Sequence, residues 1–316
     1  MEIYGDIETD KIKEDLLIKR AKRVKGSDLQ YEERNGLPIL SFPLLSSCDM
    51  IEHLFTTRLG GVSKGVCSSM NLGFHRGDEK EAVLENYNRL AKAMNLEAED
   101  LVCTVQTHTT NIRVVTKEDC GKGVLLPTGY QDIDGMITNE RGIGLVALFA
   151  DCVPLYFVDP VKKVIGLAHS GWRGTVARMG QHMVKEMEKQ FGCDPKDILA
   201  AIGPSICVDC YEVDETVACE FREEFKADLG LIDLIREEKL YFSSKKNWEL
   251  LNPGKEDGKY QLDLWLANLI ILLKAGIKPC NIEVTDICTC HNPEFLFSHR
   301  ASAGKRGNLA ACLMLK

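Results

Sequence analysis

GIGLVALFADCVPLYFVDPVKKVIGLAHSGWRGT, residues 142–175, carries the strongest structural signals in the chain. Val153–Val158 and Val164–Ala168 are runs of apolar, β-branched and aromatic residues, which favour buried strands. Between them lie Asp159, Pro160 and their neighbours, which are typical turn residues in a gap of hairpin size. The stretch therefore predicts a buried β-hairpin.

The predicted hairpin brings two reactive side chains together. If it folds symmetrically about Pro160-Val161, Cys152 lies opposite His169, with Cβ atoms about 4.5–5.5 Å apart. A slip of one residue would place the two on opposite faces of the sheet. A thiol and an imidazole at this distance indicate either a metal site or nucleophilic catalysis.

Three neighbouring features strengthen this interpretation. Asp151 precedes the cysteine and can orient a ligand or bind a substrate hydroxyl. Arg173, between glycines at a predicted helix start, combines with backbone N–H groups as an anion site. His108, on a separate loop after a predicted strand, can supply a third ligand. Two imidazoles, one thiolate and an open position suit catalytic zinc, with copper as the alternative metal.

Composition limits the classes of function. The chain has 316 residues, of which 45% are hydrophobic and 27% charged, as in ordinary globular proteins. We expect no membrane association, because no apolar run could span a bilayer, and a cytoplasmic location, because the acidic N-terminus does not resemble a signal peptide. The 13 cysteines are then mostly reduced thiols. A net charge of −8 argues against nucleic acid as a partner.

Helix and strand signals alternate along the whole chain without repeats or a linker, which favours a single α/β domain. Asn35-Gly36, between strand-like arms in Tyr31–Phe42, predicts a second hairpin. We therefore expect an N-terminal extension with a hairpin over residues 1–45 and a catalytic domain over 46–316. Residues 230–260 are polar and predict an irregular insertion.

A second group of metal-binding residue types lies near the C-terminal end. Cys207-x-x-Cys210, together with Cys288-x-Cys290 and His291, is compatible with a structural zinc site. The spacing is loose, and buried thiols are the simpler interpretation.

Several motifs together resemble the YfiH/YlmD family, which has been labelled a multicopper polyphenol oxidase or laccase-domain family and is understood as purine nucleoside phosphorylases. The resemblance runs from about residue 50 onward. The motifs that carry it are Thr57-Arg58-x-Gly60-Gly61-Val62-Ser63, Ser69-Met70-Asn71-Leu72-Gly73, Gln106-Thr107-His108, Asp134-Gly135, Ala150-Asp151-Cys152-Val153-Pro154, His169-Ser170-Gly171-Trp172-Arg173-Gly174, Gly203-Pro204-Ser205-Ile206, Cys210-Tyr211-Glu212-Val213, Cys288-Thr289 and Phe297-Ser298-His299-Arg300.

The resemblance implies a mixed-sheet α/β sandwich, similar to the catalytic domains of cytotoxic necrotizing factors. It implies that the metal ligands are His108, Cys152 and His169. It also implies phosphorolysis of adenosine, inosine, guanosine and methylthioadenosine, with adenosine deamination also attributed to the family. The Gly304–Asn308 segment, GKRGN, departs from the family's commoner Gly-Arg ending and leaves the role of Arg306 open.

On this basis we expect zinc-assisted phosphorolysis, with phosphate held by Arg173 and Arg58. The leaving purine needs an acid, for which Asp134, Asp151 and a bound water are unranked candidates. The resemblance also places Asn71 and Arg300 near the pocket. The partners expected are purine nucleosides and phosphate, and the protein is expected to be a monomer or homodimer.

Three other functions stay open at the sequence level. In a metal-free cysteine hydrolase, Cys152 is the nucleophile and His169 its base. A copper polyphenol oxidase is disfavoured, because no His-x-His pair occurs among the seven histidines. A binding protein with a structural metal would need a fourth protein ligand.

Overall fold

The predicted hairpin lies inside a six-stranded sheet. In the computed structural model, which describes residues 7–13, 16–21, 29–238, 240–241 and 249–316, strand β10 (Val153–Asp159) pairs antiparallel with β11 (Val164–Ser170). Every residue of both strands is buried. The continuous apolar pattern of the two runs therefore reflects a sheet that is covered on both faces.

The predicted register is wrong by two residues. His169 lies opposite Pro154 rather than opposite Cys152. The cause is the turn: the Asp159 carboxylate accepts hydrogen bonds from the backbone N–H groups of Val161 and Lys162, at 2.8 and 2.9 Å, and the loop has four residues. Because side chains alternate with a period of two, this shift keeps Cys152 and His169 on one face.

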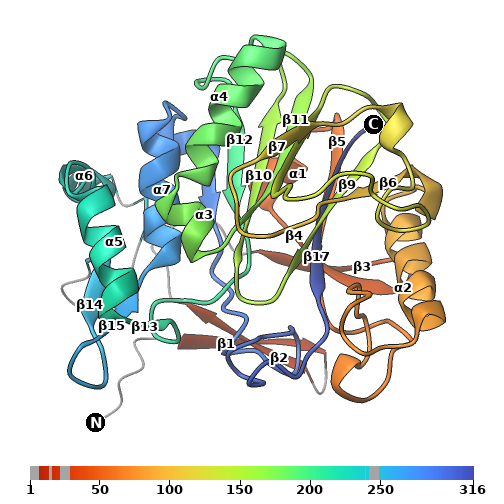
Figure 1. Cartoon of the computed structure of the whole chain (residues 1–316), viewed down its shortest axis with the longest axis horizontal. Coiled ribbons are helices and arrows are strands. Elements are labelled where there is room, and N and C mark those ends of the chain that lie inside the picture. Colours follow the sequence, from red (N-terminus) through yellow and green to blue (C-terminus); the bar gives the residue numbers. More distant parts are fainter. Residues whose placement is uncertain (1–6, 14–15, 22–28, 239, 242–248) are drawn as a thin grey trace.

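Two mixed six-stranded sheets form the middle of the molecule (Figure 1). The first has the order β16-β12-β10-β11-β8-β7 and the second β3-β4-β5-β17-β9-β6. Their other strands are β3 (Gln30–Arg34), β4 (Leu37–Ser41), β5 (Ile51–Thr56), β6 (Leu101–Cys103), β7 (Ile112–Val114), β8 (Gly135–Thr138), β9 (Gly144–Phe149), β12 (Leu199–Ile202), β16 (Ile282–Val284) and β17 (Leu309–Leu315).

Strand β17 holds the second sheet together although it is the last strand in sequence. It pairs antiparallel with β5 on one side and with β9 on the other, so these two strands are joined only through it. All seven of its residues are buried.

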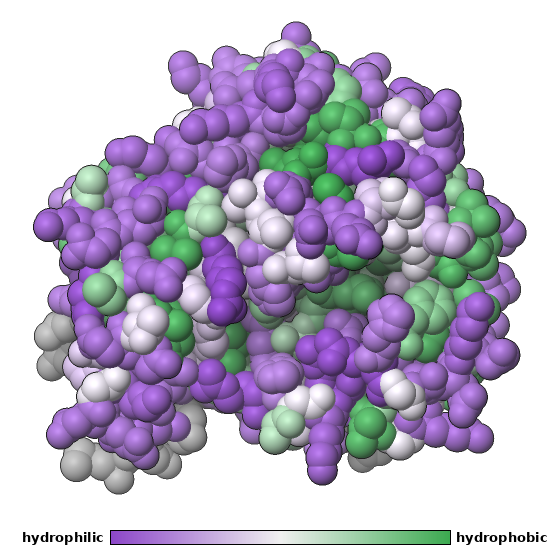
Figure 2. Space-filling model, in the orientation of Figure 1, coloured by the Kyte–Doolittle hydropathy of each residue, from purple (hydrophilic) through white to green (hydrophobic). Residues whose placement is uncertain are grey.

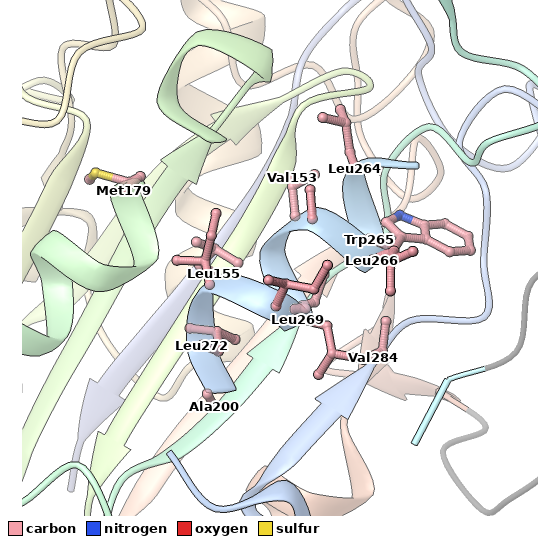
Figure 3. Packing of buried hydrophobic residues seen from close by; sticks show 14 of the residues in the cluster. Val153, Leu155, Met179, Ala200, Leu264, Trp265, Leu266, Leu269, Leu272 and Val284 are labelled. Atoms are coloured by element: carbon pink, nitrogen blue, oxygen red, sulfur yellow. The ribbon is translucent and has the colours of Figure 1, made fainter. Parts of the chain in front are cut away.

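Helices cover the outer faces of both sheets. Tyr156 and Val158 of β10 point between the sheets, whereas Leu155 and Phe157 pack on the helical side. There they meet α4 (Met179–Phe191) and α7 (Leu264–Lys274), and Figure 3 shows Leu269 and Leu272 of α7 beside Leu155. Helix α2 (Lys80–Ala93) covers the second sheet. The predicted mixed-sheet α/β sandwich in a single domain is thus confirmed.

The remaining elements lie around this sandwich. They are β1 (Ile7–Lys13), β2 (Leu16–Ala21), α1 (Pro43–Ser46), η1 (Gly65–Cys67), η2 (Ala98–Asp100), η3 (Lys117–Asp119), α3 (Trp172–Val176), β13 (Glu212–Asp214), α5 (Glu215–Phe225), α6 (Gly230–Glu237), β14 (Leu251–Pro253), β15 (Lys259–Leu262) and η4 (Pro279–Asn281). Among the helices described, none has the length and apolar character needed to cross a membrane.

The predicted Asn35-Gly36 hairpin is confirmed as β3–β4, with both turn residues at positive φ. Parts of the predicted extension, residues 1–6, 14–15 and 22–28, lie outside the described residues. So do 239 and 242–248 of the predicted insertion. Its described part includes α6, whose Ile232 and Ile235 are buried in the main core. The proposed domain boundaries stay predictions.

Candidate active site

Three side chains from separate parts of the fold meet at one point. Cys152 follows β9, His169 lies in β11, and His108 lies on the loop between β6 and β7. One ligand atom from each lies within 4.8 Å of the others. Cys152 Sγ is 4.0 Å from His108 Nε2, and the two imidazole rings stand edge to face with centroids 5.0 Å apart.

Asp134, which is fully buried just before β8, holds this arrangement in place. Its Oδ1 lies 2.8 Å from His169 Nδ1 and accepts the backbone N–H of His108 at 3.1 Å. Its Oδ2 accepts the backbone N–H groups of Thr107 and Thr109 and the Thr109 hydroxyl. One carboxylate thus orients both histidines.

The trio is electrostatically coupled. Burial would raise the pKa of the Cys152 thiol, but the charge of His169 and a hydrogen bond with His108 lower it to about 6. Burial would lower the pKa of His169, yet Cys152 and the hydrogen bond to Asp134 raise it to about 9. Both pKa shifts favour a thiolate on Cys152 beside an imidazolium on His169.

Backbone geometry leaves no spare room at the trio. A Cβ on Gly171 would lie 2.9 Å from His108 Cδ2 and 3.0 Å from Cys152 Sγ. Asp151, next to the cysteine, has φ +86°, a strained conformation for a residue with a side chain. Its carboxylate accepts the Thr289 hydroxyl and the Arg300 backbone N–H, both at 2.6 Å, and these contacts stabilise the turn.

The donor set fits a catalytic zinc ion. Because Asp134 engages Nδ1 of His169, the other ring nitrogen is left as a ligand, which is the common carboxylate–histidine–metal arrangement. Zn–S of about 2.3 Å and Zn–N of about 2.0–2.1 Å in a tetrahedron separate sulfur and nitrogen by about 3.6 Å. The distance of 4.0 Å between Cys152 Sγ and His108 Nε2 is close to that separation.

All three residues of the trio line a cavity of about 940 Å³, a volume suited to a small-molecule ligand. In Figure 2 this face of the molecule is hollowed to the right of its centre, where pale green apolar residues are visible. Apolar side chains line one part of the cavity: Phe74, Val124, Leu125, Leu126, Pro127 and Leu148.

Two arginines line the same cavity as the trio. Arg76 Nε and Arg306 Nη1 both donate to the side-chain oxygen of Asn308, each at 2.7 Å. Arg306 is only 9% exposed, and its Nε has no hydrogen-bond partner in the described part of the chain. Burial, followed by repulsion from Arg76, lowers the pKa of Arg306 to about 10. Two cations held this close favour an anion.

The other arginines named from the sequence are placed differently. The guanidinium of Arg58 donates to the carbonyl oxygens of Ser68 and Pro293. Neither Arg58 nor these two acceptor residues are among the residues that line the cavity. The guanidinium of Arg300 donates to the carbonyl oxygens of Cys210 and Glu212. None of the hydrogen bonds described for these two guanidiniums involves the trio.

Arg173 and Asn71 also lie outside the residues that line the cavity. Arg173 is exposed, with its guanidinium 4.1 Å from the ring centroid of Trp172. Asn71 is buried, and its Oδ1 accepts the backbone N–H groups of Gly73 and Asn308. It thereby joins the Gly73–Arg76 wall of the cavity to the start of β17. The functional roles of all four residues stay predictions.

Sequence reasoning missed Arg76 as a cavity residue and left Arg306 open. The available signal was weak: Arg76 lies five positions after Asn71, and Arg306 lies in the segment that departs from the family pattern. Their common contact with Asn308 depends on a tertiary approach across 232 positions of sequence.

Known proteins resemble this chain over most of its length. Residues 52–316 match the model of a family described as multi-copper polyphenol oxidoreductase laccase. Purine nucleoside phosphorylase YlmD of Bacillus subtilis (strain 168) is 37% identical over 263 residues, which cover 83% of this chain and 87% of that protein. An adenosine deaminase from an unknown prokaryotic organism is 31% identical over 256 residues, covering 80% and 90%.

The fold is also found among solved structures. The crystal structure of YlmD from Geobacillus stearothermophilus superposes with a TM-score of 0.78 at 34% identity. The superposition covers 92% of this chain and 100% of that one.

Proposed function

The chain belongs to the multi-copper polyphenol oxidoreductase laccase family, with YlmD and YfiH among its structural relatives, and from this premise we propose that it is a zinc-dependent purine nucleoside phosphorylase. The observation that carries the proposal is the shared cavity, which is lined by a donor set of two histidines and one cysteine, by two arginines and by several apolar side chains. These parts suit a metal, a phosphate and a purine respectively.

In the proposed reaction, phosphate bonds to C1′ of the ribose and the bond from C1′ to the purine nitrogen breaks. Arg76 and Arg306, which both line the cavity, hold the phosphate oxygens. The apolar wall with Phe74 and Leu148 receives the purine. Holding both reactants in one cavity removes the entropic cost of their encounter from the chemical step.

A zinc ion on His108, Cys152 and His169 would supply a Lewis acid close to the developing charges. Asp134 acts as a positioning residue, because its two oxygens already accept five hydrogen bonds. Both oxygens of Asp151 also have donors. We therefore assign delivery of the proton to the departing purine to a water molecule in the cavity rather than to either carboxyl, and this water regains a proton from the attacking hydrogen phosphate.

The direct test is to incubate the purified protein with phosphate and each of adenosine, inosine, guanosine and methylthioadenosine. We expect free base and ribose 1-phosphate, or the corresponding methylthioribose product, with no release of base when phosphate is omitted. Inosine formed from adenosine without phosphate would instead identify adenosine deamination. Absence of both reactions with zinc-loaded protein would refute the proposal.

One observation favours a second function. The thiolate–imidazolium pair formed by Cys152 and His169 is the charge state that a cysteine hydrolase needs. A chelator abolishes phosphorolysis but spares such a hydrolase, whereas both lose activity on alkylation of Cys152. A copper oxidase would instead oxidise phenols when loaded with copper, a reaction that we do not expect here.

A further inference from the structure

A second set of metal-binding side chains lies apart from the trio. Cys207, Cys210, Cys288 and His291 each offer one ligand atom, and these four atoms all lie within 4.8 Å of one another. Cys207 and Cys288 are buried, and the other two residues are partly buried. The site therefore offers four converging donors, compared with three at the candidate active site.

The sheet explains why two distant segments meet here. Strands β12 and β16 are parallel neighbours, so the segments that follow them leave the sheet at the same edge. An isolated parallel bridge joins Ser205 to Cys288, and Thr289 donates its backbone N–H to the Ser205 carbonyl. This pairing sets Cys288 beside Cys207, whose backbone N–H lies 3.3 Å from Cys288 Sγ.

The local spacing matches structural zinc sites. Cys207 and Cys210 flank a turn in which the Cys207 carbonyl accepts the backbone N–H of Cys210 at 3.1 Å. Cys288 and His291 repeat the separation of three positions. Cys207 Sγ lies 3.7 Å from His291 Nδ1, against the sulfur–nitrogen edge of about 3.6 Å in a zinc tetrahedron.

From these contacts we propose that Cys207, Cys210, Cys288 and His291 bind a second zinc ion as a closed, four-coordinate structural site. Three thiolates and one imidazole favour zinc over hard cations such as magnesium and leave no position for substrate. The Arg300 guanidinium holds the backbone of one proposed ligand, because it donates to the Cys210 carbonyl at 3.1 Å.

The proposed ion would also stabilise the active-site turn. Thr289, between two residues of the cluster segment, donates its hydroxyl to Asp151, and Ile206, next to Cys207, donates its backbone N–H to the Asp151 carbonyl. Both segments that carry the proposed zinc ligands therefore contact Asp151, the strained residue that precedes Cys152. Loss of the second ion is expected to loosen that turn.

The experiment separates the two sites by metal content and ligand type. The wild-type protein, expressed with added zinc and purified without chelator, is analysed by mass spectrometry for metals and by X-ray absorption at the zinc edge. We expect two zinc ions per chain. In the double variant His108→Ala/Cys152→Ser one ion should stay, with an absorption spectrum of three sulfurs and one nitrogen.

A ligand variant and a matched control complete the test. Cys210→Ser, at a partly buried ligand, should retain the second ion at least tenfold less well in competition with a chromophoric chelator. Cys193→Ser, at a buried cysteine of the same hydrophobic core outside the cluster, should keep two ions.

If Cys210→Ser does not fold, the double variant still decides. A folded His108→Ala/Cys152→Ser protein without zinc would overturn the proposal. A disulfide among the cluster cysteines would also overturn the proposal, which needs free thiols as ligands. All 13 cysteines are free in the structure, and thiol titration of denatured, unreduced protein would detect such a disulfide. Neither measurement depends on enzymatic activity.

Discussion

Replacing Asp134 by asparagine tests whether one buried carboxylate organises the candidate active site. The substitution keeps the size of the side chain but exchanges one accepting oxygen for a donating NH2 group. If the NH2 group replaces Oδ2, the backbone N–H groups of Thr107 and Thr109 lose their acceptor. If it replaces Oδ1, it faces His169 Nδ1 and the His108 backbone N–H.

Either orientation leaves about two donors without a partner, and the contacts from Thr107, His108 and Thr109 are partly buried. At the lower end of the range of about 1–3 kcal/mol for an unsatisfied group, Asp134→Asn should lower the free energy of unfolding by about 2 kcal/mol. Loss of the carboxylate that orients a metal-binding histidine typically weakens metal affinity by about 10–100-fold. We expect zinc affinity at the trio to fall within that range.

The assay combines two measurements at a fixed pH. Urea unfolding in the presence of chelator gives the change in stability, and competition with a chromophoric chelator gives the zinc affinity of the trio. Asp132→Asn is the matched control, because Asp132 lies on the same segment and is exposed. The hydrogen bond described for its carboxylate is with the Thr107 hydroxyl and does not involve a proposed metal ligand. An Asp134→Asn protein with wild-type zinc affinity and less than about 1 kcal/mol of destabilisation would refute the reasoning.

The pH dependence of stability gives an independent check on Asp134. Burial tends to raise the pKa of its carboxyl, but hydrogen bonds, first from His169 and then from the Thr109 backbone, lower it below the usual value. A lowered folded-state pKa means that the stabilisation is present above the unfolded-state pKa and is lost as the pH falls through the folded-state pKa. The acid limb of the stability curve should therefore be shallower in Asp134→Asn.

Three further predictions concern the cavity. Cys152→Ala should abolish both zinc binding at the trio and phosphorolysis, and retention of either would contradict the ligand assignment. Arg306→Met should raise the KM for phosphate at least tenfold while leaving zinc content unchanged, whereas an unaltered KM would remove Arg306 from the phosphate site. Gly171→Ala places a Cβ within 3.0 Å of Cys152 Sγ, so zinc affinity at the trio should fall at least tenfold. Gly230→Ala is the control, because a Cβ there meets no atom within 4 Å, and it should have no effect on metal content.

The local parts of the fold could be predicted because their determinants are local. The apolar runs around Asp159 and the Asn35-Gly36 turn specify hairpins through nearest-neighbour chemistry. The register of β10 and β11 was missed because it depends on how the Asp159 carboxylate caps its own turn. The pattern of apolar residues in the two strands does not reveal these hydrogen bonds of Asp159.

The candidate site was predictable only in part. Spacing alone indicated Cys152 and His169, since one hairpin carries both, whereas His108 was only a possible third ligand on a separate loop until the family resemblance implied it. No local rule connects Arg76 with Arg306, because their contact forms only when β17 inserts into the second sheet. The convergence of the cluster around Cys207 could not be predicted for the same reason, because its two halves meet through the parallel pairing of β12 and β16.

The position of β17 has a consequence for biosynthesis. Ribosomes make β5 and β9 long before residues 309–315, so the nascent chain carries two open strand edges that only the late segment can close. Arg306 and Asn308 arrive with that segment. Under the proposed function, the phosphate-binding arginine is therefore added, and the two strand edges are closed, in the same late step.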